Sequence, residues 1–184
     1  MQLRNSPERY GALPKLLHWL TVVLVVLAWS LGTFGDDLPR GATRAAGMSI
    51  HMAAGLTVIG LLAIRIVWRV TDPPPPPIAT PLGNLLISIS KFAHFALYAL
   101  LAATPAVGIL VQFARGDALP LYGLVEIASP WVRDRAFAGS MKEIHETLAN
   151  LLMILAVVHA TAACVHHWIF RDRTLARMLP GIAR

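Results

Sequence analysis

Long apolar stretches without any charged residue alternate with shorter polar segments along this chain. Four stretches lack Asp, Glu, Lys and Arg altogether, at 16–35, 45–64, 92–114 and 147–170. A helix of about 20 apolar residues spans the hydrocarbon core of a bilayer. The pattern therefore predicts an all-α integral membrane protein, a four-transmembrane-helix bundle that forms a single membrane domain (1–184), with helices at approximately 14–35, 45–70, 88–114 and 143–170.

The composition supports this reading and argues against a soluble enzyme. The 184 residues are 56% hydrophobic and only 14% charged, whereas soluble domains average about 25% charged residues. The charge-free stretches cover nearly half of the chain, so the remainder is too short for a soluble domain of useful size. The chain has one cysteine, Cys164, which lies inside an apolar stretch. A single cysteine excludes a disulfide framework and a thiolate metal cluster.

The distribution of basic residues predicts the orientation in the membrane. The two tails and the connection between the second and third predicted helices hold ten of the 16 Lys and Arg residues, against six in the other two connections. Cytoplasmic segments retain the excess of positive charge. We therefore expect both termini in the cytoplasm of a multi-pass membrane protein. No aromatic-basic motif indicates nucleic acid as a partner of this basic chain.

The connections and the small residues suggest further features. The longest connection, from Arg115 to about Ser140, mixes charged with aromatic residues, and we expect it to pack over the outer mouth of the bundle. Gly47, Gly55 and Gly60 on the second predicted helix leave room for close helix packing or for a flat ligand.

Histidine carries most of the chemical information in the sequence. All seven fall in or directly beside the apolar stretches: His18, His51, His94, His145, His159, His166 and His167. Ionisable side chains at membrane depth are costly and are usually functional. One such imidazole is explained equally well by a hydrogen bond to a neighbouring helix. Seven in four helices favour a metal or cofactor site, because neutral imidazole binds iron, zinc and copper well.

The spacing of two histidines narrows the choice of cofactor. His145 and His159 are 14 residues apart, which on a helix places them within about 40° of one face and about 21 Å apart along the axis. One helix then carries two stacked sites. Zinc requires three or four ligands that converge on one point, and the predicted helices show no such cluster. A low-spin haem requires two axial imidazoles.

Each stacked site then needs a second histidine from another helix. His51 opens the second predicted helix on the outer side, level with His145. His18 opens the first on the inner side and is available for His159. Because His159 lies deeper in its helix than His18, His166 competes for the same role on depth alone. The chain has no Cys-x-x-Cys-His motif, so any haem is b-type and is held without thioether bonds.

These residues resemble the bacterial di-haem cytochrome b561 family over nearly the whole chain. The resemblance rests on five features of the sequence: His18-Trp19, His51, the segment Arg65 to Arg69, His145-Glu146-Thr147-Leu148-Ala149-Asn150, and His166-His167 before a basic tail. It implies two b haems, one ligated by His51 and His145 near the periplasm and the other by His18 and His159 nearer the cytoplasm. It also implies superoxide as a small anionic donor at the periplasmic face and ubiquinone as the acceptor.

Other polar residues near the predicted helix ends suit the same chemistry. Arg65 and Arg69, four apart on one face, are candidate partners for the inner haem propionates, although both suit anchoring to lipid headgroups equally. Lys142 precedes His145 by one turn and is a candidate contact for a propionate or an anionic substrate. A quinone head group has four candidate contacts at the inner side, which are Lys91, His94, His166 and His167.

The sequence leaves the electron donor and the partners open. The first hypothesis is an electron-transfer oxidoreductase that moves electrons between a periplasmic donor and the quinone pool, as a superoxide:ubiquinone oxidoreductase. The alternative is a haem-bearing anchor subunit that serves a separate soluble dehydrogenase or hydrogenase. A metal or proton transporter would require carboxylates in the apolar stretches, which contain none. Whether the bundle forms a homodimer is also left open.

Overall fold

Four long helices make up most of the chain that the computed structural model describes, residues 2–78 and 83–179. They are α1 (Ala12–Phe34), α2 (Ala42–Thr71), α3 (Gly83–Ala114) and α4 (Arg135–Trp168). Each is long and apolar enough to cross a membrane. The predicted class, a membrane bundle of four helices, is therefore confirmed.

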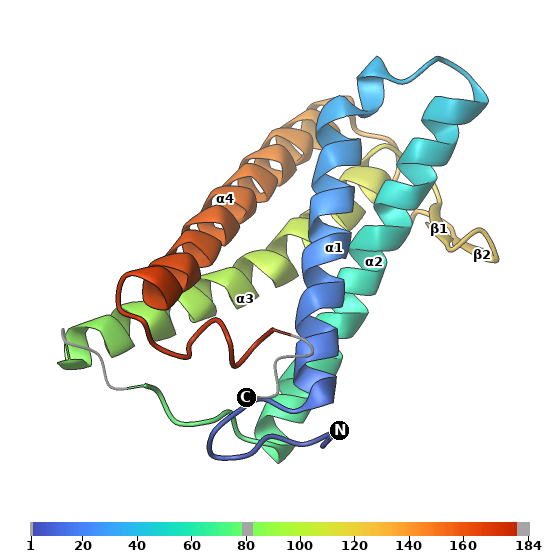
Figure 1. Ribbon diagram of the computed structural model, residues 1–184. Coiled ribbons are helices and arrows are strands. Elements are labelled where there is room, and N and C mark those ends of the chain that lie inside the picture. The colour runs from blue at the N-terminus through green and yellow to red at the C-terminus, as the bar shows by residue number, and fades with distance from the viewer. Residues whose placement is uncertain (1, 79–82, 180–184) are drawn as a thin grey trace.

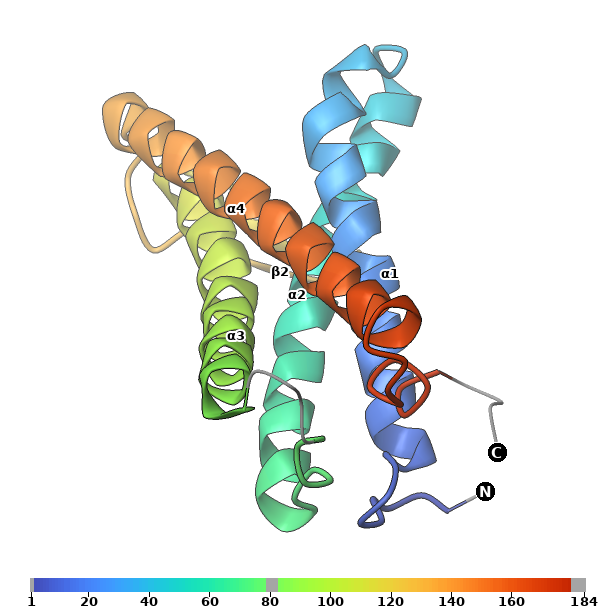
Figure 2. The ribbon, with the colours of Figure 1, turned by 60° about the vertical axis from the view of Figure 1, so that its left-hand side comes forward.

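The helices associate as two antiparallel pairs. α1 packs along α2 and α3 packs along α4, while the pairs have fewer contacts with each other (Figure 1). Figure 2 shows α4 crossing α1 obliquely. The core lies where the pairs meet and is formed by Val58, Leu62, Leu101 and Leu152. Large apolar side chains such as Val70 and Phe95 point outward and are more than two-thirds exposed, as expected of a surface that faces lipid.

All four helices begin earlier than their predicted starts, and the difference is largest for α3 and α4. α4 begins at Arg135 rather than near 143, and α3 at Gly83 rather than near 88. The Asp134 side chain accepts a hydrogen bond from the Phe137 backbone N–H at 3.0 Å and so caps the first turn of α4. The predicted spans were built around charge-free stretches, so they miss the turns of α3 before Lys91 and the charged first turns of α4.

The connection between α3 and α4 contains the only strands in the described residues. β1 (Leu119–Leu121) and β2 (Val125–Ile127) form an antiparallel hairpin. Three residues, Tyr122, Gly123 and Leu124, connect the paired strands. Tyr122 and Gly123 have positive φ, and the Leu124 backbone N–H donates to the Leu121 carbonyl at 3.0 Å, which closes a tight turn. The Tyr122 hydroxyl hydrogen-bonds Thr57 of α2 at 3.2 Å. The hairpin therefore lies against the side of α2 (Figure 1). The sequence predicted instead that this connection packs over the mouth of the bundle.

The two tails meet on one side of the bundle. The Lys15 ammonium donates to the carbonyl oxygen of Leu179 at 3.1 Å, and the Trp19 indole donates to that of Met178 at 3.0 Å. The N-terminal tail also contacts the end of α2, because the Asn5 backbone N–H donates to the Asp72 carboxylate at 2.9 Å. The segments before α1 and after α4 are thus on the same face of the protein, as an even number of spans requires.

Candidate cofactor site

His51 of α2 and His145 of α4 face each other across the two helix pairs. Their ring centres are 6.0 Å apart. His51 Nδ1 lies 2.8 Å from the carbonyl oxygen of Ala28 on α1, and His145 Nδ1 lies 2.9 Å from that of Thr104 on α3. A carbonyl can only accept, so both Nδ1 atoms carry the proton. The lone pair of each ring is therefore on Nε2, the tautomer that a metal-binding imidazole requires.

A glycine lies beside each of these rings. A Cβ atom at Gly32 of α1 would be 3.0 Å from His51 Cε1, and a Cβ atom at Gly108 of α3 would be 3.0 Å from His145 Cε1. Each glycine is four residues after the residue whose carbonyl holds the ring. The two rings are thus positioned in the same way, by one carbonyl and one glycine of the partner helix within each pair.

The depths of His51 and His145 also agree. His51 is nine residues from the start of α2 and His145 is ten residues from the start of α4, which puts each about 14 Å from the helix end that lies away from the two tails. That end of the bundle is called outer, and the end where the tails meet is called inner. The predicted start near 143 implied that His145 opens its helix. This was wrong, because α4 begins ten residues before His145. The buried hydroxyl of Thr104 beside this pair has no hydrogen-bond partner in the described part of the chain, so it is available to a bound group.

A second histidine pair lies toward the face where the tails meet. The ring centres of His18 on α1 and His159 on α4 are 6.5 Å apart. His94 of α3 contacts the other side of this pair, with its ring centre 5.1 Å from that of His159. Its Nδ1 donates to the Ser90 carbonyl at 2.6 Å. Because α4 crosses α1 obliquely (Figure 2), residues at unequal depths in the two helices can meet.

The distances in both pairs fit one metal ion between two imidazoles. A metal–imidazole bond is about 2 Å long, so two rings that bind one ion from opposite sides have centres a little over ~6 Å apart. The observed 6.0 and 6.5 Å agree with that value. Among the described residues there is no group of three or more His, Cys, Asp or Glu that could hold an ion. The residues therefore fit a haem held by two axial ligands better than a zinc site.

The two arginines near the inner pair differ in their surroundings. The Arg65 guanidinium lies 5.3 Å from the centre of the Tyr98 ring and close enough to His18 and His159 to interact electrostatically with both. Arg69, one turn further along α2, interacts instead with Tyr10. Burial raises the pKa of Tyr10, an effect that Arg69 and Arg177 oppose. Arg65 is thus the better placed of the two to contact a group bound between the histidines.

Three other residues were predicted to contact a quinone at the inner side: His166, Lys91 and His167. His166 Nδ1 lies 2.6 Å from the Asp172 carboxylate, and the Thr174 backbone N–H donates to the same carboxylate at 2.8 Å. Burial raises the pKa of Asp172, but these hydrogen bonds outweigh it and hold the pKa below its ordinary value of 3.8. His166 therefore ties the C-terminal tail to α4. Lys91 and His167 are exposed.

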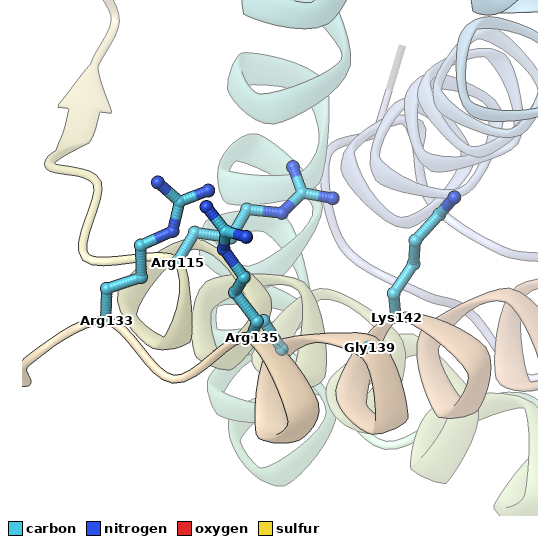
Figure 3. Close-up of a pocket in the computed structure, with 6 residues that line it drawn as sticks. Arg115, Arg133, Arg135, Gly139 and Lys142 are labelled. Carbon is cyan, nitrogen blue, oxygen red and sulfur yellow. The ribbon is translucent and has the colours of Figure 1, made fainter.

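Lys142 belongs to a cluster of cations at the opposite end of the bundle. Arg115, Arg133, Arg135, Ala138, Gly139 and Lys142 line a pocket of about 200 Å³, the outer basic pocket (Figure 3). Lys142 also pairs with Glu146 at 3.4 Å. Lys142 is three residues before His145, so the pocket adjoins the outer histidine pair.

Four residues of the outer site were missed by sequence reasoning. Ala28 and Thr104 act through backbone carbonyls, which every residue has, so no residue type marks them. Gly32 and Gly108 are mid-helix glycines and could have been noticed. Of the three glycines that were singled out, Gly47 is closely packed, since a Cβ atom there would be 2.8 Å from Leu38 Cδ1. Gly55 faces Pro105 at ordinary contact distance, and Gly60 has open space around it.

Comparison with known proteins shows the family to which the chain is similar. Residues 9–181 match the family described as prokaryotic cytochrome b561. The chain is 31% identical to the probable superoxide oxidase CybB of Yersinia pestis, over 94% of this chain and 97% of that protein. It is 32% identical to cytochrome b561 homolog 2 of Escherichia coli strain K12, over 97% and 95%, and 27% identical to cytochrome b562 of Cereibacter sphaeroides, over 92% and 94%.

Proposed function

This chain belongs to the prokaryotic cytochrome b561 family, and from that premise we propose that it is a di-haem electron carrier of the bacterial inner membrane. Family membership makes it a membrane cytochrome with haem b. The proposal adds the number of haems, their ligands, the donor and the acceptor. The observation that carries it is the presence of two facing histidine pairs, 14 residues apart on α4.

The haem ligands in this proposal are His51 with His145 and His18 with His159. Haem held by two imidazoles exchanges single electrons and has no open axial position for oxygen chemistry at iron. The protein orients the outer ligands through the carbonyls of Ala28 and Thr104. Arg65 is the proposed partner of an inner propionate. Two sites stacked along α4, about 21 Å apart along its axis, form a route for electrons across the membrane.

The proposed donor is superoxide, which reaches the outer haem from the periplasm. One relative is named a probable superoxide oxidase, and Lys142 of the outer basic pocket is three residues before His145 on α4. A local group of cations attracts a small anion even where the net charge of that side is close to zero. The proposed orientation follows the distribution of basic residues, with both tails in the cytoplasm.

The proposed acceptor is ubiquinone at the inner pair. His94 is exposed, contacts the ring of His159, and uses Nδ1 on the Ser90 carbonyl, which leaves Nε2 for a quinone oxygen. An imidazole can donate and accept protons, and quinone reduction requires protons. Lys91 is one turn before His94 on α3 and adds a positive charge at the same level.

A haem count together with an electron-transfer assay tests the proposal. The reduced-minus-oxidised visible spectrum and a pyridine haemochrome ratio of the purified protein should give about two low-spin b haems per chain. Superoxide generated in the presence of ubiquinone should then reduce the quinone in step with its own loss. One high-spin haem would contradict the ligand pairs. Two haems without superoxide oxidation would favour the alternative, an anchor subunit that serves a soluble redox partner.

A further inference from the structure

The outer basic pocket is formed by cations from three parts of the chain. Arg115 follows the last residue of α3, Arg133 belongs to the loop before α4, and Arg135 and Lys142 lie on α4. Figure 3 shows the three guanidinium groups pointing to the same side of α4, with Lys142 further along the helix. Arg135 and Lys142 are seven residues apart and therefore lie within about 20° of one face.

Backbone contacts hold the arginines together. The Asp134 backbone N–H donates to the Ala114 carbonyl at 3.0 Å, which joins the loop to the end of α3. Gly116 has a φ of 75°, and a Cβ atom there would be 3.2 Å from Arg133 Cβ. Only glycine adopts this conformation readily and allows Arg133 to approach so closely. The convergence of Arg115 and Arg133 is thus built into the fold.

Two small residues of α4 line the pocket between its cations. Gly139 lies between Arg135 and Lys142 on α4, and a Cβ atom at Gly139 would meet nothing within 4 Å. The neighbouring Ala138 is buried. A mid-helix glycine costs about 1 kcal/mol relative to alanine, so the space above Gly139 is kept at some cost in helix stability.

The charges in this pocket are poorly compensated by the protein. Over residues 2–78 and 83–179, no carboxylate oxygen lies within 4.0 Å of the guanidinium groups of Arg115, Arg133 or Arg135. Arg135 also occupies the first turn of α4, where the helix dipole disfavours a cation. The Asp134 carboxylate at the N-cap accepts from the Phe137 backbone N–H and forms no ion pair with these arginines. An anion in the pocket would relieve the mutual repulsion of the three guanidinium groups.

We propose that the outer basic pocket binds a phosphate group, from inorganic phosphate or from the headgroup of an outer-leaflet phospholipid. Guanidinium groups bind phosphate oxygens in a bidentate manner, and Lys142 adds a fourth cation beyond Gly139. A pocket of about 200 Å³ is smaller than the ~300 Å³ of the smallest usual organic-ligand sites and suits one oxoanion group. Phosphate donates no electron to haem, so it is not the proposed donor and would compete with superoxide for the same cations.

Binding is measured on the full-length holoprotein in neutral detergent. Thermal unfolding is followed as inorganic phosphate replaces chloride at constant ionic strength, and retained phosphatidylglycerol is counted by native mass spectrometry. We expect saturable stabilisation by phosphate, retention of about one lipid, or both. Phosphate alone identifies the free ion as the ligand, and lipid alone identifies the headgroup.

Matched variants test whether the ligand occupies this pocket. Arg133→Gln and Arg135→Gln should each weaken binding about tenfold, the loss expected for a charge-assisted hydrogen-bonding group. Arg40→Gln removes the same charge from the same side at a position outside the pocket and should have no effect. Gly139→Leu should weaken binding by filling the pocket without removing a charge, whereas Gly139→Ala should not.

Two results would overturn the proposal. One is that wild-type protein shows neither saturable stabilisation by phosphate nor retained phosphatidylglycerol. The other is that Arg40→Gln weakens binding as much as Arg135→Gln, which would indicate general attraction and no defined site. Neither result bears on haem content or on quinone reduction, so failure here is distinguishable from failure of the proposed function.

Discussion

Replacing Gly108 by alanine should remove the outer haem selectively while leaving the helix intact. The new Cβ atom would be 3.0 Å from His145 Cε1 and 3.3 Å from Nδ1, whereas ordinary contacts begin at 3.4 Å. The ring must therefore withdraw by about 0.4 Å, while metal–ligand distances tolerate only about 0.2 Å. Because alanine favours the helix by about 1 kcal/mol over glycine, loss of haem would not reflect a weaker α3.

The assay is a haem-to-protein ratio with a reduced-minus-oxidised spectrum, alongside circular dichroism for helix content. Gly108→Ala should lower the ratio from about two toward one and leave the helix content unchanged. Gly60→Ala is the matched control, because a Cβ atom there meets nothing within 4 Å, and it should keep both haems. Two unaltered haems in Gly108→Ala would refute the reasoning, as would loss of the inner haem in place of the outer one.

Three further predictions follow from the same geometry. His145→Ala should halve the haem content, and loss of both haems or of neither in a haemochrome assay would undo the pairing. His94→Ala should keep both haems but slow quinone reduction by stopped-flow spectroscopy, and a lost haem would instead make His94 a ligand. Folding lowers the pKa of Asp172, so its carboxylate contributes to the free energy of unfolding above pH 3.8. This contribution is lost as pH falls through the pKa of the folded protein. Asp172→Asn should therefore lower the unfolding temperature at neutral pH, and its difference from wild type should shrink below pH 3.8; a constant difference would refute the role of the carboxylate.

The interior of each helix was predicted more accurately than its ends. The predicted span 45–70 differs little from α2 (Ala42–Thr71), whereas α4 begins eight residues before its predicted start. The bilayer thickness sets a minimum apolar length that the sequence displays directly. The first turn of α4 depends on a local hydrogen bond from Phe137 to Asp134, and it carries charges that hydropathy assigns to a loop.

The sequence by itself determined the number of membrane helices and the ionisable residue type that lies within them, histidine. Both follow from one-dimensional properties, which are the length of apolar runs and the presence of imidazole where ionisable groups are costly. The histidine spacing indicated two stacked sites on α4, but could not choose between His159 and His166 as the partner of His18.

Only the tertiary structure decided which groups meet. The crossing of α1 and α4 brings His18 opposite His159, and the tail that folds back after α4 pairs His166 with Asp172. The carbonyls of Ala28 and Thr104 and the convergence of Arg115 with Arg133 likewise depend on how helices and loops pack. Such contacts join residues far apart in the chain, so they are set by helix crossing angles and loop geometry that no local pattern encodes.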